Sequence, residues 1–287
     1  MIGADRLQPK QTAAMAVLAG LLEARTGQRI AANRTWRIET ALKPVLRARG
    51  LETLDDLVAE LLKDQTGSIS DAVIDALLNQ ETSFFRDAGV LEAVGVAVDA
   101  IGAAAPGRRP RIWSAACSVG QEPLSLAMLF AERTLNHGGL EPEILATDVS
   151  EAAILRARAG RYSQFEIQRG LPVRRMITWF DAVGAEWVAK PDLVRRVTYR
   201  RHNLVGESPP PGPFDLILCR NILLYLSPMV RQQVFEQLLR AIRPDGLLVL
   251  GAGETVIGQS DLFVPSMRAK GFYEPAPTAS KRARAAG

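Results

Sequence analysis

Two carboxylates stand where an open α/β sheet would bind a ligand. Asp148 comes directly after the apolar run 143–147, and Glu122 begins a predicted helix that follows the run 111–116. Because such sheets bind ligands at the carboxyl ends of their strands, Asp148 can accept hydrogen bonds from both ribose hydroxyls of a nucleoside. The alternative roles are structural: Asp148 as a cap of the next helix, and Glu122 as a complement to a helix dipole. An acidic side chain at a helix start also suits a ligand that carries an amine better than it suits a pyrophosphate.

Small residues connect the run 111–116 to that helix, in a loop that ends at Gly120. Small side chains let the backbone approach a ligand closely. The pattern Gly-x-Gly-x-x-Gly is absent here, which argues against a dinucleotide-dependent dehydrogenase.

Polar residues also follow the later apolar runs. Asn221 comes after the run 214–219, with Tyr225 four positions further on, and both are candidates for contacting the reacting centre. Asn203 follows the run at about 196–200 and can hydrogen-bond an adenine edge. A plain turn role explains Asn203 nearly as well.

The segment 79–87 reads Asn-Gln-Glu-Thr-Ser-Phe-Phe-Arg-Asp, a string that no generic fold requirement explains. A surface loop seldom carries Phe84 and Phe85 side by side, and a core segment seldom carries so many polar neighbours. We interpret the segment as a lid, with the Phe pair holding it down and Thr82 and Arg86 pointing into the pocket. The structural alternative is a connector anchored by its Phe pair, with Arg86 in an ion pair.

The elements that must position these residues fall into two groups. Up to residue 78 the pattern indicates helices only, at 11–25, about 34–49, about 53–63 and 70–78. From residue 111 the pattern alternates between strands and helices. The predicted strands are 111–116, 143–147, about 196–200, 214–219 and 247–252, and the predicted helices are 122–133, 150–159 and 228–242.

This organisation predicts an α/β protein with an additional helical domain. The expected parts are a helical domain over 1–78, a lid and connecting helix over 79–110, and an α/β domain over 111–274. The alternation fails at about 161–193, where aromatic residues crowd into a polar stretch, and we expect a small subdomain there. The basic tail 275–287 is predicted to be disordered.

Composition excludes several classes of protein. The chain has 287 residues, 47% of them hydrophobic and 23% charged, with a formal net charge of +4. Its apolar runs are shorter than the roughly 18 residues that a membrane span needs, and the start lacks a signal-peptide core. Two cysteines and two histidines predict neither a disulfide framework nor a metal site. We therefore expect a cytoplasmic protein that is not embedded in a membrane and whose cysteines are free thiols.

Several of these motifs, in this order, resemble the CheR family, the glutamate O-methyltransferases of chemotaxis receptors. The resemblance extends from about Thr26 to about residue 273. Its specific parts are Glu81-Thr82-Ser83-Phe84-Phe85-Arg86-Asp87, Trp113 to Ser118, Gly120-Gln121-Glu122-Pro123, Ala146-Thr147-Asp148, and Phe214 to Asn221.

The resemblance implies a fold, a cofactor and an activity. The fold is the Rossmann-like sheet of class I S-adenosylmethionine-dependent methyltransferases, with a small β-subdomain and an amino-terminal helical domain. The activity is methyl transfer from S-adenosylmethionine to receptor glutamates, giving methyl esters in chemotaxis adaptation. The positions implied to bind the cofactor are Gln80, Thr82, Arg86, Gly120, Glu122, Asp148, Asn203, Leu204, Arg220 and Asn221. Gln80 departs from the family pattern, in which Asn is frequent at that place.

Independently of the resemblance, the residues are consistent with this chemistry. A glutamate side chain has a pKa of about 4.3, so near neutral pH it attacks a sulfonium methyl group without a general base. The remaining task is to align the reactants. We predict that Arg86 positions the cofactor or the incoming carboxylate and that Tyr225 lines the methyl site.

A basic face in the helical domain predicts where the receptor binds. Arg34, Arg37, Lys43 and Arg47 lie on or beside one predicted helix, and such a face can steer the glutamate-rich methylation helices of a receptor. A solvated face without a partner is the ordinary alternative. The short stretch 180–185 lacks the longer loop of family members that bind a receptor's carboxyl-terminal pentapeptide. We therefore predict that this chain does not need that tether.

Two other functions fit parts of the sequence. A regulator that senses S-adenosylmethionine without turnover would keep the pocket, and the departure at Gln80 leaves that reading open. A nucleic-acid methyltransferase would fit the pI of about 9.3, but the chain has no recognisable nucleic-acid-binding motif. In the place of an Asn-Pro-Pro-Tyr strand end it has Arg220-Asn221-Ile222-Leu223.

Overall fold

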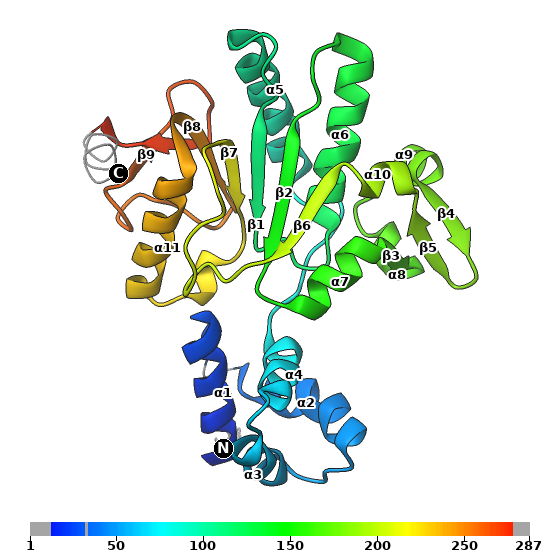
Figure 1. Cartoon of the computed structure of the whole chain (residues 1–287), viewed down its shortest axis with the longest axis vertical. Helices are drawn as coiled ribbons and strands as arrows, with labels where there is room; N and C mark the ends of the chain where they lie inside the picture. The colour runs from blue at the N-terminus through cyan, green and yellow to red at the C-terminus, as the bar shows by residue number, and fades with distance from the viewer. Residues whose placement is uncertain (1–12, 32–33, 278–287) are drawn as a thin grey trace, which may run out of the picture. The chain divides into compact units, whose positions relative to one another are not determined.

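A computed structural model describes residues 13–31 and 34–277 of the chain (Figure 1). The chain divides into two compact units, residues 1–79 and 80–287. The segment predicted to form a lid therefore begins the second unit at Gln80.

The described residues of the first unit form a small helical bundle. Its helices are α1 (Ala13–Thr26), α2 (Trp36–Arg49), α3 (Leu54–Lys63) and α4 (Ser68–Leu77). In α2 the residues Ile38, Leu42 and Leu46 recur every fourth position, and this face is buried. The helix ends at Gly50, whose left-handed backbone (φ 66°) lets its N–H bond to the carbonyls of the last turn.

A seven-stranded sheet forms the centre of the second unit, in the order β6-β2-β1-β7-β8-β10-β9. The five strands from β6 to β8 are parallel, and β10 pairs antiparallel with both β8 and β9. Their bounds are β1 (Arg111–Ala115), β2 (Glu143–Asp148), β6 (Val197–Arg201), β7 (Phe214–Cys219), β8 (Ile242–Leu250), β9 (Phe263–Pro265) and β10 (Tyr273–Pro275). The predicted α/β class is confirmed.

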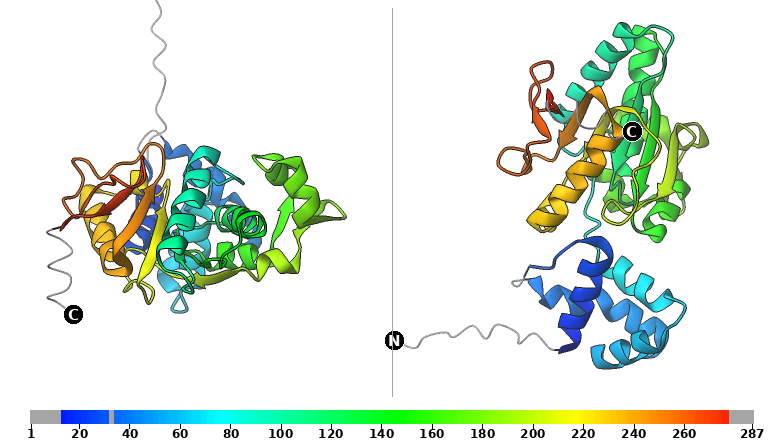
Figure 2. Two further views of the ribbon diagram at one scale, coloured as in Figure 1. Left: turned by 90° about the horizontal axis from the view of Figure 1, so that it is seen from above. Right: turned by 60° about the vertical axis from the view of Figure 1, so that its left-hand side comes forward.

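Helices cover the sheet on both faces (Figures 1 and 2). One core lies under α5 (Ala88–Ala104), α6 (Gln121–His137) and α7 (Glu151–Ala159), and the other under α11 (Pro228–Ala241). Successive residues of a strand point to opposite faces, so Ile112 joins the first core and Trp113 the second. The buried sheet fixes the carboxyl ends of β1, β2 and β7 side by side, with Ala115 paired to Thr147 and to Cys219.

A small antiparallel sheet occupies the stretch where the βαβ alternation fails. Its strand order is β3-β5-β4. Its elements are β3 (Arg161–Ser163), α8 (Gln164–Gln168), α9 (Val173–Trp179), β4 (Phe180–Val183), β5 (Glu186–Ala189) and α10 (Pro191–Val194). The residues predicted as a short loop, 180–185, are mostly strand: only Gly184, with φ 62°, and Ala185 connect β4 to β5.

Two predicted boundaries were wrong. The strand predicted at 247–252 begins at Ile242, and Pro244 to Gly246 lie within it, where the pairing with β7 shifts register between Phe214 and Leu216. An irregular stretch can accommodate a proline, which has no N–H for the ladder. The predicted tail also begins too early, because Pro275 belongs to β10 and Ala276 is buried. Residues 278–287 of that tail lie outside the described part of the chain.

Candidate functional site

The loop between β1 and α6 makes a tight turn at the carboxyl edge of the sheet. Ala116 and Ser118 both have positive φ angles, 58° and 53°, which non-glycine residues seldom adopt. Gly120 has φ 96°, and a Cβ there would lie 2.8 Å from the Cβ of Ala157 in α7. The glycine thus permits close packing of the α6 start against α7, a requirement distinct from the close approach of a ligand that the sequence predicted.

Asp148, at the end of β2, joins this loop to its own. Its Oδ2 accepts a hydrogen bond from the Ser118 N–H at 2.8 Å, and its Oδ1 accepts one from the Ser150 N–H at 3.0 Å. The helix cap itself is Ser150, whose hydroxyl accepts the Ala153 N–H. Ser150, and not Asp148, therefore caps the helix. A carboxylate can accept more than two hydrogen bonds, so the two backbone contacts orient the group and are compatible with ribose hydroxyls.

Glu122 lies in the first turn of α6, as predicted, and is part of a network of charges. Its Oε1 accepts the Ser114 hydroxyl at 2.8 Å, and its Oε2 accepts Nη1 of Arg220 at 2.9 Å. The Arg220 side chain is only 2% exposed and also donates from Nη2 to Asp87 Oδ2 at 2.6 Å and to the Arg86 carbonyl at 3.0 Å. Arg220 therefore connects the segment 80–87 to the start of α6. The sequence assigned Arg220 to cofactor binding and did not foresee this bridge.

The segment 80–87 is held to the rest of the second unit along most of its length. The Ser118 hydroxyl donates to the Gln80 carbonyl at 3.1 Å, and Arg169 pairs with Glu81 at 2.6 Å. The Phe85 N–H donates to the Ser125 hydroxyl in α6 at 3.0 Å. The segment therefore contacts the β1–α6 loop, α6 and the small subdomain.

Phe84 and Phe85 anchor this segment, as predicted. Both side chains are buried, at 0% and 7% exposure. The Phe84 ring packs edge-on against Tyr162 and Phe180, with centroids 5.0 and 5.5 Å apart. The guanidinium of Arg175 lies over the Phe85 ring at 4.2 Å, a cation–π contact.

Thr82 and Arg86 are half-buried in this segment. The Arg86 guanidinium donates to the Glu81 carbonyl at 3.0 Å. That bond fixes the guanidinium within its own segment, and the predicted roles of both residues stay predictions.

Asn221 follows β7 in a left-handed backbone conformation, with φ 59°. Its N–H donates to Glu254 Oε2 at 2.7 Å. The same carboxylate accepts the N–H groups of Leu223 at 2.7 Å, Leu224 at 3.4 Å and Gly251 at 2.8 Å. Sequence reasoning missed Glu254. The available signal was the string Gly-Ala-Gly-Glu over 251–254, directly after a buried apolar strand.

Asn203 and Leu204 follow β6, the neighbour of β2. The side-chain oxygen of Asn203 accepts the Val205 N–H at 3.0 Å, which is the turn role that was left open. Leu204 is buried in the core that lies under α11. Tyr225 ends a short 3₁₀-helix over Leu223–Tyr225 and is half-buried.

Cys117 and Cys219 are free and buried at the ends of β1 and β7. Burial raises the pKa of both thiols well above the ordinary value, and the carboxylates Asp148 and Glu122 raise that of Cys117 further. Neutral thiols are poor nucleophiles. Both residues therefore act as small buried side chains, as the sequence indicated.

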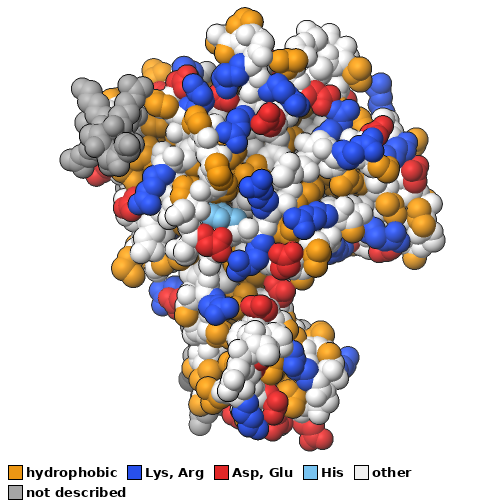
Figure 3. Space-filling model, viewed as in Figure 1, with side chains coloured by type: hydrophobic (Ala, Val, Ile, Leu, Met, Phe, Trp, Pro, Cys, Tyr) orange, Lys and Arg blue, Asp and Glu red, His pale blue; other side chains and the backbone are white. Residues whose placement is uncertain are grey.

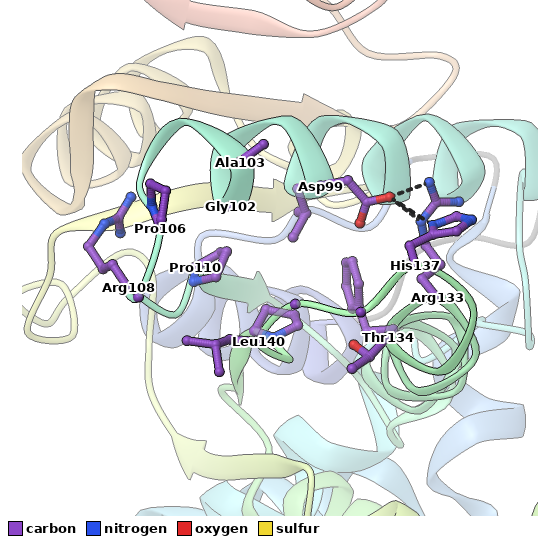
Figure 4. Close-up of a pocket in the computed structure, with 16 residues that line it drawn as sticks. Asp99, Gly102, Ala103, Pro106, Arg108, Pro110, Arg133, Thr134, His137 and Leu140 are labelled. Carbon is purple, nitrogen blue, oxygen red and sulfur yellow. Dashed lines mark hydrogen bonds and ion pairs between the residues drawn. The ribbon is translucent and has the colours of Figure 1, made fainter.

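A cavity of about 540 Å³ lies at the opposite edge of the sheet, between the carboxyl-terminal halves of α5 and α6 (Figure 4). Its charged side chains already have partners: Asp99 holds Arg133 at 2.6 Å and lies 3.5 Å from His137, and Arg108 pairs with Asp215, which lies outside the lining. None of the predicted site residues lines it. The candidate site is therefore at the carboxyl edge.

The described residues suit S-adenosylmethionine at that edge. Asp148 presents a carboxylate that two backbone N–H groups orient, and Glu122 places a second carboxylate, paired with Arg220, at the start of α6. The loop that carries Ser118 connects the two carboxylates. It leads into α6, which carries Glu122, and its Ser118 N–H donates to Asp148. Helices on both faces and parallel strands that carry these carboxylates at their carboxyl ends are features of a Rossmann-like domain that binds a nucleoside-containing ligand.

Comparison with known proteins identifies the family. Residues 80–271 match the family model described as CheR methyltransferase, SAM binding domain. The chain belongs to the CheR methyltransferase family, and its predicted cofactor, S-adenosylmethionine, is confirmed.

Similar proteins cover most of the chain. It is 32% identical over 245 residues to a chemotaxis protein methyltransferase of Pseudomonas putida, covering 84% of this chain and 89% of that protein. It is 35% identical over 240 residues to chemotaxis protein methyltransferase 1 of Pseudomonas aeruginosa, covering 82% and 87%. A chemotaxis protein methyltransferase of Vibrio parahaemolyticus is 34% identical over 246 residues, covering 84% and 89%. Among the described residues, no helix is long and apolar enough to cross a membrane.

Proposed function

We propose that this chain transfers a methyl group from S-adenosylmethionine to glutamate side chains of chemoreceptors, forming methyl esters. The observation that carries the proposal is the match of residues 80–271 to the family's SAM binding domain, whose carboxyl edge holds the oriented carboxylates Asp148 and Glu122. The names of the similar proteins support chemotaxis as the setting.

In this proposal Asp148 binds the ribose and Glu122 the amino group of the cofactor. The cofactor-binding set is completed by Gln80, Thr82, Gly120, Asn203 and Leu204, and Arg220 contributes by holding Glu122 and the lid. Asn221 and Tyr225 contact the reacting centre. When bound, S-adenosylmethionine supplies an electrophilic methyl group on a sulfonium. The protein's residues bind and orient both reactants, which is the main requirement of a displacement whose nucleophile is already ionised.

Two of the candidate residues suit a carboxylate acceptor. Arg86 carries a permanent positive charge that can orient a carboxylate, and Tyr225 offers a hydroxyl. A carboxylate near neutral pH needs no residue to remove a proton, whereas an amine acceptor does. The candidate residues therefore fit an acidic acceptor better than a basic one.

The receptor would bind the basic face of α2. Arg34, Arg37, Lys43 and Arg47 are all exposed, and the buried residues of α2 lie elsewhere on the helix. We also propose that the protein works in the cytoplasm. The two-residue turn between β4 and β5 supports binding without a carboxyl-terminal pentapeptide tether, and strong retention of the protein on an immobilised pentapeptide would contradict that part.

A methyl-transfer assay tests the proposal. The protein is incubated with S-adenosylmethionine labelled in the methyl group and with a receptor cytoplasmic fragment, DNA or RNA as acceptor. We expect label in the receptor alone, lost on mild alkaline treatment because methyl esters hydrolyse, and mapped to glutamates by peptide mass spectrometry. Alkali-stable label would contradict ester formation.

The same assay separates the alternatives. Label in DNA or RNA would indicate a nucleic-acid methyltransferase. Cofactor binding by calorimetry with no label in any acceptor would indicate a regulator without turnover. On the face drawn in Figure 3, Lys and Arg side chains are interspersed with Asp and Glu.

A further inference from the structure

Glu254 collects four backbone N–H groups on one carboxylate. Oε2 accepts from Asn221 at 2.7 Å and Gly251 at 2.8 Å, and Oε1 accepts from Leu223 at 2.7 Å and Leu224 at 3.4 Å. A carboxylate offers about four accepting positions. All of them are directed at backbone, so Glu254 is committed to holding the protein and does not face a ligand.

The four donors belong to two separate loops. Asn221, Leu223 and Leu224 follow β7, and Gly251 follows β8, its parallel neighbour. Strand pairing ends at Cys219 and Leu250. Beyond that point, the Glu254 carboxylate connects the two loops in place of the sheet's hydrogen bonds.

The connection holds Asn221 in a conformation that it would not favour alone. Its φ of 59° is left-handed, which non-glycine residues seldom adopt. Gly251 is packed against it so closely that a Cβ would lie 2.6 Å from Asn221 Nδ2 and 2.7 Å from Glu254 Oε2. The segment from Asn221 to Tyr225, including its 3₁₀ turn, is therefore shaped by Glu254 and by the missing side chain at Gly251.

We propose that Glu254 is a positioning residue for the acceptor half of the site. It acts through Asn221 and Tyr225, and the inference rests on the proposed methyl transfer in which those residues contact the reacting centre. The residues expected to bind the ribose and amine, Asp148 and Glu122, are held by contacts that do not involve Glu254. Loss of Glu254 should therefore impair transfer more than it impairs cofactor binding.

The substitution Glu254→Gln tests this directly. A glutamine has one accepting oxygen, and its amide N–H₂ would face two backbone donors. Whichever way the amide turns, either the Asn221 and Gly251 contacts or the Leu223 and Leu224 contacts are lost. We expect kcat for receptor methylation to fall about tenfold or more, as misplacement of reacting groups does. The calorimetric Kd for S-adenosylmethionine should stay within about threefold, because weak coupling of separate sites has effects of that order.

Two further variants complete the experiment. Glu236→Gln is the matched control, because Glu236 lies on α11 and contacts Gln232; it should leave kcat and Kd unchanged. Gly251→Ala keeps the glutamate but forces Asn221 and the Glu254 carboxylate apart. It should reproduce the split between kcat and Kd, which keeps the test decisive if Glu254→Gln does not fold.

The outcomes separate the inference from the proposed function. Wild-type protein that methylates no receptor glutamate would overturn the proposed function. If the wild type methylates receptor glutamates and Glu254→Gln does so with a normal kcat, the inference about Glu254 is overturned and the proposed function stands. So would a variant whose kcat, cofactor affinity and melting temperature fall together, since that is the pattern of a merely structural residue.

Discussion

In the proposed function, Asp148 combines a structural role and a binding role in one side chain. Its two oxygens hold the loops after β1 and β2 through the N–H groups of Ser118 and Ser150. Because the backbone fixes the carboxylate before any ligand arrives, binding a ribose there does not require a long side chain to be immobilised. Glu122 is pre-oriented in the same way by Ser114 and Arg220.

Replacing this carboxylate should weaken cofactor binding. In Asp148→Asn the side chain keeps its size but gains an N–H₂ that faces a backbone donor, and it loses the charge that strengthens its hydrogen bonds. Hydrogen bonds to charged groups contribute about 1.5–3 kcal/mol, so we expect the Kd for S-adenosylmethionine, measured by calorimetry, to rise about tenfold or more. Asp192→Asn, at an exposed ion pair with Arg195, is the control. An unchanged Kd for Asp148→Asn would remove Asp148 from the site.

The effect of Arg86 on methyl transfer can be measured separately from any effect on the stability of the fold. Its guanidinium contacts the Glu81 carbonyl of its own segment, so truncation leaves no buried charge behind. We expect Arg86→Ala to reduce kcat/KM for receptor methylation by about two orders of magnitude or more with an unchanged melting temperature. Arg174→Ala, an exposed arginine on α9, should be as active as wild type. Near-normal turnover by Arg86→Ala would contradict the assigned role.

His202 gives the fold a dependence on pH. Its side chain is 7% exposed, and burial lowers its pKa below the ordinary value, although Glu207 at 3.3 Å partly offsets this. The unfolded chain therefore binds the proton at higher pH than the folded chain. Stability should be full above about pH 6.5 and fall as the pH drops through the lower folded pKa. Urea denaturation of wild type and His202→Gln from pH 7.5 to 5 should show a difference that shrinks on acidification, and a constant difference would contradict this.

At the scale of elements, the segment 80–87 is held by three different kinds of contact. Its aromatic pair is buried, its backbone bonds Ser125 and Ser118, and Arg220 reaches its carboxyl-terminal end from the loop after β7. A segment fixed at so many points is a well-anchored part of the second unit, and in the proposed function it is a fixed wall of the site. The small subdomain packs closely against this segment: a Cβ added at Gly170 would lie only 2.1 Å from the Phe84 carbonyl oxygen, so only glycine fits there.

Removing the aromatic anchor should destabilise the second unit. Phe84 has 0% exposure and contacts Tyr162 and Phe180, so Phe84→Ala leaves a cavity between the segment and the subdomain. Such substitutions cost about 3–5 kcal/mol. Chemical denaturation should show this loss, whereas Phe165→Ala, at a side chain that is 74% exposed, should change the free energy of unfolding by less than about 0.5 kcal/mol. A small effect at Phe84 would mean that the segment is anchored elsewhere.

The sequence predicted the elements with a clear hydrophobic period and the side chains at the ends of strands. The parallel strands β1, β2, β6 and β7 fall close to their predicted ranges, because buried strands are short apolar runs bounded by polar residues. It could not predict the bridge from Arg220 to Asp87, since the two residues are 133 positions apart and nothing local couples them. Glu254 was missed for a similar reason: its partners are backbone N–H groups, which no residue type reveals.

At the scale of the whole molecule, the two units carry different parts of the proposed work. The second unit holds the predicted cofactor residues and matches the family's S-adenosylmethionine-binding domain over residues 80–271. The first unit has a compact helical core, and it exposes Arg37, Lys43 and Arg47 on α2 and Arg34 just before that helix. None of these four forms an ion pair with a side chain in residues 13–31 or 34–277. Their charge is therefore available to an acidic partner.

Reversing charge on α2 should slow receptor methylation without affecting cofactor binding. In the double variant Arg37→Glu and Arg47→Glu, attraction of a glutamate-rich helix becomes repulsion, and kcat/KM for the receptor at low salt should fall about tenfold or more. The Kd for S-adenosylmethionine should not change. A control with the same change in net charge, Arg29→Glu and Lys63→Glu, alters exposed residues that already pair with Glu23 and Glu60 and should have a smaller effect.

Salt provides the second measurement of the same attraction. Screening acts over about 10 Å at 0.1 M salt, so the wild-type kcat/KM should decline steeply as salt rises, whereas that of the α2 variant should be flat or increase. If wild type and variant have the same slope, long-range steering by α2 is absent, because a difference that persists at every salt concentration reflects short-range contacts. A flat wild-type profile combined with equal rates for both proteins would place the receptor on another surface.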